Sequence, residues 1–196
     1  MRVDLKTVEQ WVVNDAHILD LGCGDGTLLA MLNDKKNVNG VGVEINPEKI
    51  QACIEKHVQV IEVDMSIALE NCVDNGFDVV IMTQSLQVVR HPNEILDHVL
   101  RVGKEAIIAF PNFAHWSSRL YLASKGKMPV SKNLPFSWFD TPNIHFFTLR
   151  DFEEYCKNQG IEVLDRCVLN SNNKPDALSK FLPNVFGSTA IYRIKR

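Results

Sequence analysis

The sequence predicts an α/β protein built on a mostly parallel β-sheet with helices packed on both faces. Strand and helix signals alternate along most of the chain, and the strands are near-continuous apolar runs, which is typical of parallel strands buried on both sides. A glycine-rich loop follows the first strand, at the place where folds of this class hold a nucleotide. These two observations together predict a three-layer α/β sandwich.

Seven segments have the composition of strands, with helices expected between them. The expected strands are 17–21, 38–45, 58–63, 77–82, 106–110, 161–168 and 190–194. Apolar residues at helical spacing predict a lead-in helix over 5–13, and a short helix is expected over 176–182.

Capping chemistry predicts where several helices begin and end. The run Asn46-Pro47-Glu48 offers an N-cap amide, a proline at the first helical position and an acid near the positive end of the helix dipole. Thr148 and Asp151 have the spacing of a capping box. Asn93 is expected to cap the helix before the fifth strand. Asn33-Asp34 is expected to end the helix that follows the glycine loop.

Residues 112–147 break the alternation of strands and helices. This segment holds eight of the sixteen aromatic residues of the chain, together with Pro129, Pro135 and Pro142. Helical spacing is expected to return only at Thr148. The segment is interpreted as an aromatic-rich insertion after the fifth strand. It forms either a satellite core under a long loop or a surface for a substrate or partner.

Composition limits the class of protein. A chain of 196 residues is expected to form a single domain over 1–196, and its net charge of −3 argues against a nucleic-acid partner. No apolar run approaches the ~18 residues of a membrane span, and the first ten residues lack the apolar core of a signal peptide. Five cysteines without a C-x-x-C pair favour reduced thiols in the cytoplasm and argue against a metal site.

The run from Ile18 to Thr27 carries the strongest functional signal. An apolar strand containing Asp20 leads into three glycines, which expose bare backbone at the start of a helix. Glu44 closes the next strand 18 positions after the last of these glycines, Gly26 (44 − 26). A carboxylate at that place is suited to accept hydrogen bonds from the two hydroxyls of a ribose.

The glycine spacing and the nearby acids indicate which nucleotide the loop binds. The spacing is G-x-G-x-G, and the third glycine of a dinucleotide-binding G-x-G-x-x-G motif would fall on Thr27. Asp20 and Asp25 flank the loop and would repel a pyrophosphate, which prefers helix N-terminal amides without a nearby acid. A cationic ligand that carries an ammonium and a sulfonium group suits this charge better.

These residues resemble motif I of the class I S-adenosylmethionine (SAM) methyltransferases, in Leu19-Asp20-Leu21-Gly22-Cys23-Gly24-Asp25-Gly26. Further blocks across most of the chain resemble the MetW family of methionine biosynthesis proteins. The blocks are Gly42-Val43-Glu44-Ile45, Ser85-Leu86-Gln87 with His91-Pro92, Phe110-Pro111-Asn112-Phe113 with His115-Trp116, Gly126-Lys127-Met128-Pro129-Val130, Asp140-Thr141-Pro142-Asn143-Ile144-His145, and Ala190-Ile191-Tyr192.

The resemblance implies a Rossmann-like, seven-stranded sheet of order 3-2-1-4-5-7-6 with strand 7 antiparallel. It also implies SAM or S-adenosyl-L-homocysteine as the cofactor. The implied cofactor-binding residues are Asp20, Gly22, Cys23, Gly24, Glu44, Ile45, Asp64, Met65 and Gln84.

The resemblance gives most of these residues a role. Asp20 orients the loop or receives the methionine ammonium through water, and the glycines let the backbone lie against the ligand. Glu44 binds the ribose hydroxyls and Ile45 lies against the adenine. Asp64 and the Met65 amide meet the edge of the adenine. The end of the fourth strand, at Gln84, offers a carbonyl to the ammonium.

Several residues also have a purely structural interpretation. Asp64 follows a strand and could be the cap of the next helix. Cys23 is interpreted as a small filler rather than a nucleophile. His115, His145 and Tyr121 lie in the insertion and are candidate general bases, although the two histidines could equally hold the insertion closed.

Two functions follow from these interpretations. In the first, implied by the MetW resemblance, a SAM-binding accessory protein associates with the homoserine O-acyltransferase of methionine biosynthesis and ties its activity to SAM. In the second, an active SAM-dependent methyltransferase uses the insertion as the pocket for an unidentified small-molecule or protein acceptor. Neither function involves a nucleic acid or a membrane.

Overall fold

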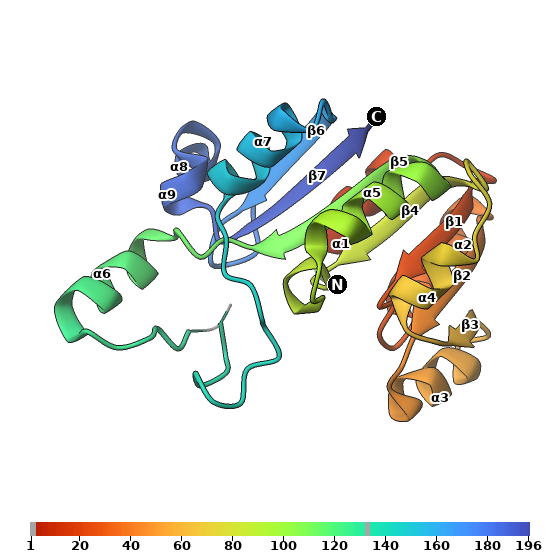
Figure 1. The fold of residues 1–196 in the computed structure, drawn as a ribbon, viewed down its shortest axis with the longest axis horizontal. Helices are drawn as coiled ribbons and strands as arrows, with labels where there is room; N and C mark the ends of the chain where they lie inside the picture. The colour runs from red at the N-terminus through yellow and green to blue at the C-terminus, as the bar shows by residue number, and fades with distance from the viewer. Residues whose placement is uncertain (1–2, 132–133) are drawn as a thin grey trace.

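The computed structural model describes residues 3–131 and 134–196, and its framework is a seven-stranded sheet (Figure 1). The strand order is β3-β2-β1-β4-β5-β7-β6, and β7 runs antiparallel to both of its neighbours while the other strand pairs are parallel. This order and direction confirm the sheet implied by the sequence. Residues 1–2 of the expected domain and 132–133 of the expected insertion lie outside the described residues.

The strands begin and end within two or three residues of the expected positions. Their bounds are β1 His17–Leu21, β2 Asn39–Glu44, β3 Gln59–Glu62, β4 Phe77–Thr83, β5 Gly103–Pro111, β6 Glu162–Leu169 and β7 Thr189–Lys195.

Helices connect the strands and flank the sheet. The bounds are α1 Val3–Trp11, α2 Thr27–Lys36, α3 Pro47–Glu55, α4 Met65–Glu70, the 3-10 helix η1 Leu86–Val88, α5 Pro92–Val102, α6 Trp116–Lys125, α7 Leu149–Asn158, α8 Ala177–Phe181 and α9 Pro183–Phe186.

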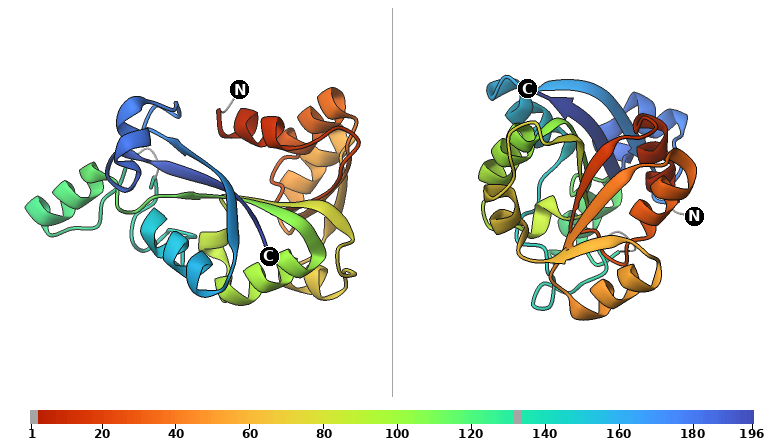
Figure 2. Two further views of the ribbon diagram at one scale, coloured as in Figure 1. Left: turned by 90° about the horizontal axis from the view of Figure 1, so that it is seen from above. Right: turned by 90° about the vertical axis from the view of Figure 1, so that its right-hand side faces the viewer.

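The sheet separates two apolar cores, one on each face. Side chains of α4, α5 and α7 pack on one face, where Phe110 and Tyr192 are fully buried. Side chains of α1, α2 and α3 pack on the other face, over Ile18 and Ile107. Figure 2 shows these helices above and below the sheet seen edge-on. The predicted three-layer arrangement is confirmed.

Two predicted helix starts are confirmed in atomic detail. The Asn46 side chain accepts hydrogen bonds from the backbone N–H groups of Glu48 and Lys49, with Pro47 at the first helical position of α3. At α7, the Thr148 hydroxyl accepts from the Asp151 N–H, and the Asp151 carboxylate accepts from the Thr148 N–H, which completes the capping box. Both caps satisfy amides that the first helical turn leaves without partners.

Three expectations about helices are wrong. Asn93 does not cap α5, because the helix begins one residue earlier at Pro92, whose fixed φ suits the first helical position. Asn33-Asp34 does not end α2, which continues to Lys36 and stops where Asn37 adopts a left-handed conformation with φ 52°.

The third wrong expectation concerns the insertion. Helical structure returns at α6, well before Thr148. The sequence pattern does not reveal α6 because the helix buries almost no apolar face: Trp116, Leu120, Tyr121 and Leu122 are all exposed. Helix α6 projects away from the sheet at one end of the molecule (Figure 1).

Within the part of the chain that the structure describes, every helix is too short or too polar to cross a membrane.

The capping box gives a stability prediction for the fold. Replacing Thr148 with alanine removes the acceptor for the Asp151 N–H at the start of α7 and lowers the free energy of unfolding by about 1 kcal/mol. Urea denaturation measures the change. Thr148→Ser keeps the hydroxyl and stays close to the wild type; equal losses for both variants would show that the cap is not the cause.

Candidate functional site

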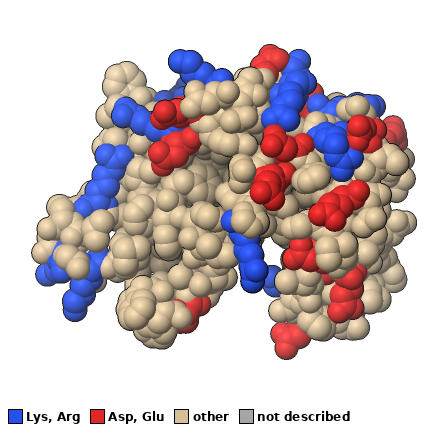
Figure 3. Space-filling model, viewed as in Figure 1, with Lys and Arg blue, Asp and Glu red and all other residues tan. Residues whose placement is uncertain are grey.

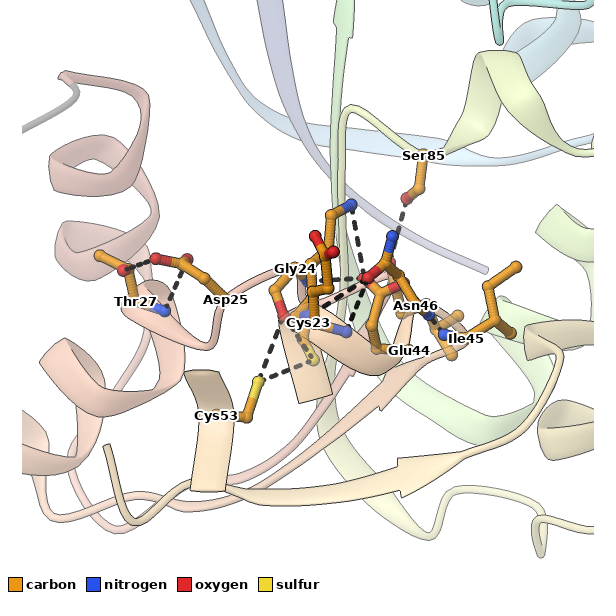
Figure 4. Close-up of polar contacts among 12 residues, drawn as sticks. Cys23, Gly24, Asp25, Thr27, Glu44, Ile45, Asn46, Cys53 and Ser85 are labelled. Atoms are coloured by element: carbon orange, nitrogen blue, oxygen red, sulfur yellow. Dashed lines mark hydrogen bonds and ion pairs between the residues drawn. The ribbon is translucent and has the colours of Figure 1, made fainter. Parts of the chain in front are cut away.

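The glycine loop leaves the carboxyl end of β1 and turns into α2 (Figure 4). Gly22, Gly24 and Gly26 have φ angles of 72°, 61° and 72°, a left-handed conformation that strains any residue with a Cβ. The Gly22 and Cys23 amides donate to the Val43 carbonyl, which ties the loop to the end of β2. A Cβ added to Gly24 would meet no atom within 4 Å, so the loop is open on that side.

Asp20 lies beneath this loop as a buried acid without a hydrogen-bond partner. The residue is only 1% exposed, and neither carboxyl oxygen has a partner among the described residues. Burial, helped by the negative charge of Glu44, raises the pKa of Asp20 to about 7. Buried polar groups in native proteins are nearly always paired, so an unpaired carboxyl points to a missing partner at this edge.

Glu44 ends β2 next to the loop, with its carboxylate held by backbone amides (Figure 4). One oxygen accepts from Gly24 N–H at 3.0 Å, and the other accepts from Ile45 N–H at 2.9 Å and Asn46 N–H at 3.0 Å. Lys49 Nζ lies 3.8 Å away. A carboxylate offers about four acceptor positions, so these three bonds fix its orientation and leave capacity for a further donor.

The residues predicted to meet the adenine lie beside Glu44 and at the end of β3. Ile45 is 63% exposed, so its side chain is accessible to a ligand. The Met65 methyl lies 3.6 Å from where a Cβ of Gly22 would be. One oxygen of Asp64 accepts from Ser66 N–H, so this residue caps α4 as its structural interpretation expected. Its role toward adenine stays a prediction.

The end of β4 closes against the glycine loop from the other side. Gln84 has a left-handed φ of 61°, donates its amide to Ala109, and accepts a hydrogen bond from the Gln87 side chain on its carbonyl oxygen. The Ser85 hydroxyl donates to the Leu21 carbonyl at 3.0 Å. The sequence alone predicts no role for Ser85 or Gln87. Both residues belong to the Ser85-Leu86-Gln87 block that resembles the MetW family, and this was the only indication of their importance.

Asp25 contributes less charge to the loop than the sequence suggested. Its carboxylate is paired with Lys56 and with the Thr27 hydroxyl, and these contacts lower its pKa to about 2. The acids at the ligand edge are therefore Asp20 and Glu44. Cys23 is buried with its Sγ 3.9 Å from that of Cys53, and burial raises the pKa of the Cys23 thiol, as expected of a filler rather than a nucleophile.

The three candidate bases lie in separate surroundings. His115 is buried at the N-cap of α6: its Nδ1 accepts from Ser117 N–H, and its Nε2 lies 3.2 Å from Ser171 Oγ. Burial lowers the pKa of His115. Nε2 of His145 lies 3.2 Å from the Arg90 carbonyl. Tyr121 is exposed on α6.

Solved structures identify the fold. Three solved structures share the fold. A SAM-dependent methyltransferase from Archaeoglobus fulgidus is 18% identical, with a TM-score of 0.69 over 100% of this chain and 92% of that one. A SAM-dependent methyltransferase from Mesorhizobium loti is 12% identical, with a TM-score of 0.70 over 99% of this chain and 98% of that one. The [4+2]-cyclase SpnF is 17% identical, with a TM-score of 0.67 over 99% of this chain and 80% of that one. The chain thus has the fold of the SAM-dependent methyltransferases.

A family comparison narrows this class. The family described as "Methionine biosynthesis protein MetW" matches residues 2–194, so the chain belongs to the MetW family. A curated relative, the bifunctional methionine biosynthesis protein MetXA/MetW of Rhodopirellula baltica, is 34% identical over 163 residues. The match covers 79% of this chain and 26% of the relative, so the chain spans about a quarter of that protein's length.

The buried acid makes stability depend on pH. The unfolded chain loses the Asp20 proton near pH 4, whereas the folded protein keeps it up to about pH 7. Stability therefore falls with rising pH across this window, by at most about 1.4 kcal/mol per pH unit from this group. Asp20→Asn removes this contribution, so in urea denaturation the variant gains stability relative to wild type between pH 4 and 7.

The exposed acid Asp34 supplies the control for this experiment. Asp34→Asn should follow the wild-type pH dependence throughout. A wild-type slope that Asp20→Asn leaves unchanged would contradict the assignment of this titration to Asp20.

Proposed function

We propose that the chain is a SAM-binding protein of methionine biosynthesis that acts with homoserine O-acyltransferase. The observation that carries the SAM part is the unpartnered carboxyl of Asp20, buried beside the open face of Gly24 and next to Glu44. A ligand that brings positive charge to this edge would satisfy the acid and offset the cost of burying it. SAM carries both an ammonium and a sulfonium group.

The proposed roles of the chain's residues follow the geometry of the edge. Asp20 receives the methionine ammonium, directly or through water, and the Gln84 carbonyl accepts from the same group. Glu44, already oriented by three backbone amides, accepts from the ribose hydroxyls. The exposed side chain of Ile45 covers one face of the adenine, and the Met65 amide meets its edge. When bound, SAM would supply an activated methyl group.

Association with the acyltransferase is supported by the relative's name and by the surface of the insertion. The Rhodopirellula protein carries MetXA and MetW in one polypeptide. In this chain the insertion exposes an aromatic surface made of Trp116, Tyr121, Phe136, Trp138, Phe139 and Phe146. Trp138 and Phe139 are 76% and 73% exposed, far more than a satellite core requires. Large exposed aromatic side chains are typical anchors of protein interfaces.

The shape and charge of this region fit a protein contact. The insertion forms the projecting end of the molecule in Figure 1. In Figure 3 its surface is mostly uncharged, with Lys and Arg at the outer tip, whereas Asp and Glu gather over the half that holds β2, β3 and α4. Depletion of charge within a projecting aromatic patch is the composition of an interface centre.

Gln87 gives a physical route between the two parts of the proposal. The Gln87 side chain donates to the Gln84 backbone carbonyl at the proposed nucleotide edge. The Gln87 backbone carbonyl accepts from Ile144 N–H at 2.9 Å and from His145 N–H at 3.1 Å, both in the insertion. A ligand that shifts Gln84 would therefore act on the base of the aromatic surface. We infer that SAM changes the affinity of the chain for the acyltransferase through this contact.

Methyl transfer to an acceptor is the second candidate, favoured by the methyltransferase neighbours. The fold alone does not show that the chain transfers methyl groups, since the [4+2]-cyclase SpnF has the same fold. A general base needs a free nitrogen or oxygen within hydrogen-bond reach of the proton that the acceptor loses. Both ring nitrogens of His115 have partners, and Nε2 of His145 lies on the Arg90 carbonyl. These contacts favour the accessory role.

Removal of the Glu44 carboxylate tests the nucleotide site. Glu44→Ala loses one or two hydrogen bonds to a charged group, worth about 1.5–3 kcal/mol each, so SAM and S-adenosylhomocysteine bind about tenfold more weakly or worse. Calorimetric titration measures the affinities. Glu44→Gln keeps one acceptor oxygen, so its affinity for both compounds should lie between those of the wild type and Glu44→Ala.

Glu62, an exposed acid at the end of the neighbouring strand β3, is the matched control, and Glu62→Ala leaves the affinities unchanged. The proposal fails if the wild type binds neither compound, or if it binds both and Glu44→Ala binds equally well.

The aromatic surface is tested by mixing the purified chain with purified homoserine O-acyltransferase, with and without SAM. The pair should co-elute in gel filtration, and the acyltransferase rate should differ from that of the enzyme alone. Trp138→Ser together with Phe139→Ser weakens the association about tenfold or more, because two exposed anchors are lost.

Phe181 on α8 is equally exposed but lies outside the insertion, so Phe181→Ser is the control and associates normally. No association, or equal loss with the control variant, would contradict this surface as the contact.

A further inference from the structure

A cavity lies at the same edge of the sheet as the glycine loop, on the far side of β5. It has a volume of about 160 Å³ and sits between the end of β5, the start of α6, the turn after β6 and the residue before β7. Its polar lining among the described residues consists of Asn112, His115, Ser117, Ser118, Ser131, Ser171 and Ser188. None of the residues proposed to bind SAM lines it.

Ser188 gives the cavity an unsatisfied hydrogen-bonding group. The residue is 1% exposed, and its hydroxyl has no partner among the described residues. Its backbone is fully used, since the N–H donates to Leu169 and the carbonyl accepts from Asn112. A buried hydroxyl without a partner is uncommon in native proteins, and here it lines a cavity with room for one.

The first turn of α6 also lines the cavity. This helix has ten residues, and its N-cap His115 and early residues Ser117 and Ser118 face the space. The N-terminus of a helix carries partial positive charge and favours anions.

His115 fixes a further donor. Its Nδ1 accepts from Ser117 N–H and lies 2.7 Å from Ser117 Oγ, and its Nε2 lies 3.2 Å from Ser171 Oγ. In the tautomer with the proton on Nε2, this nitrogen donates to Ser171 Oγ. The Ser171 hydroxyl hydrogen is then available to a ligand. The same tautomer argues against a Ser171–His115 nucleophilic pair, because Nε2 has no lone pair with which to accept the serine proton.

The described residues that line the cavity include no carboxylate. Serine hydroxyls and a helix N-terminus together form a set of donors for negative charge.

We propose that this cavity binds a small oxyanion, either inorganic phosphate or sulfate or the carboxylate of a small metabolite. Its volume corresponds to about five water molecules, which leaves room for such a group. Ser188 and Ser171 donate to the anion, and the first turn of α6 supplies the positive potential.

Anion titrations of the full chain at constant ionic strength test the proposal. Phosphate, sulfate and acetate are each compared with chloride, by thermal unfolding and by calorimetric titration. At least one of them raises the unfolding midpoint of the wild type. A preference for phosphate and sulfate identifies a tetrahedral ligand, and a preference for acetate identifies a carboxylate.

Ser188→Ala should lower the anion affinity at least tenfold while leaving the midpoint in chloride unchanged or higher, because the unpartnered hydroxyl is gone. Ser171→Ala should also weaken binding. Ser124 is the control: it is exposed on α6 with its hydroxyl on the Tyr121 carbonyl, and Ser124→Ala should bind as the wild type does. The proposal is overturned if no anion acts differently from chloride, or if Ser188→Ala and Ser171→Ala bind it undiminished.

Discussion

The arrangement at the carboxyl edge depends on a single buried acid. Asp20 stands inside the sheet without a hydrogen-bond partner and with Glu44 as a negative neighbour, so its ionised form is costly in the free protein. At Gly22, Gly24 and Gly26 the backbone of the loop is left-handed, which disfavours any side chain at these three positions. In the proposed function, positive charge from a bound ligand offsets this cost of ionising Asp20.

The sheet order divides this edge into two regions with different chemistry. The carboxyl ends of β1, β2 and β4 carry acids and bare backbone, whereas the carboxyl end of β5 and the amino end of β7 carry hydroxyls and the start of α6. Gln87 stands between them and is bonded to both the nucleotide edge and the insertion. We propose that one edge binds a cationic nucleoside and positions a protein surface, the arrangement that a SAM-responsive partner of an enzyme requires.

The sequence predicted the parts of this structure that depend on local chemistry. Apolar runs identified the seven strands, caps such as Asn46 and Thr148 identified helix starts, and the family resemblance supplied the strand order. Helix α6 escaped prediction because it lacks a buried stripe. The pairing of Asp25 with Lys56 and the cavity at Ser188 also escaped, since both join residues far apart in sequence that show no periodic pattern.

The central claim is that the carboxyl of Asp20 binds the positively charged part of a ligand. The most direct test measures the protons released when SAM binds, by calorimetry at about pH 6 in buffers of different ionisation enthalpy. Asp20 is mostly protonated there in the free protein, and a cationic ligand favours its ionised form, so binding should release up to about one proton in the wild type and none in Asp20→Asn. Binding without proton release, or no binding at all, would contradict the account.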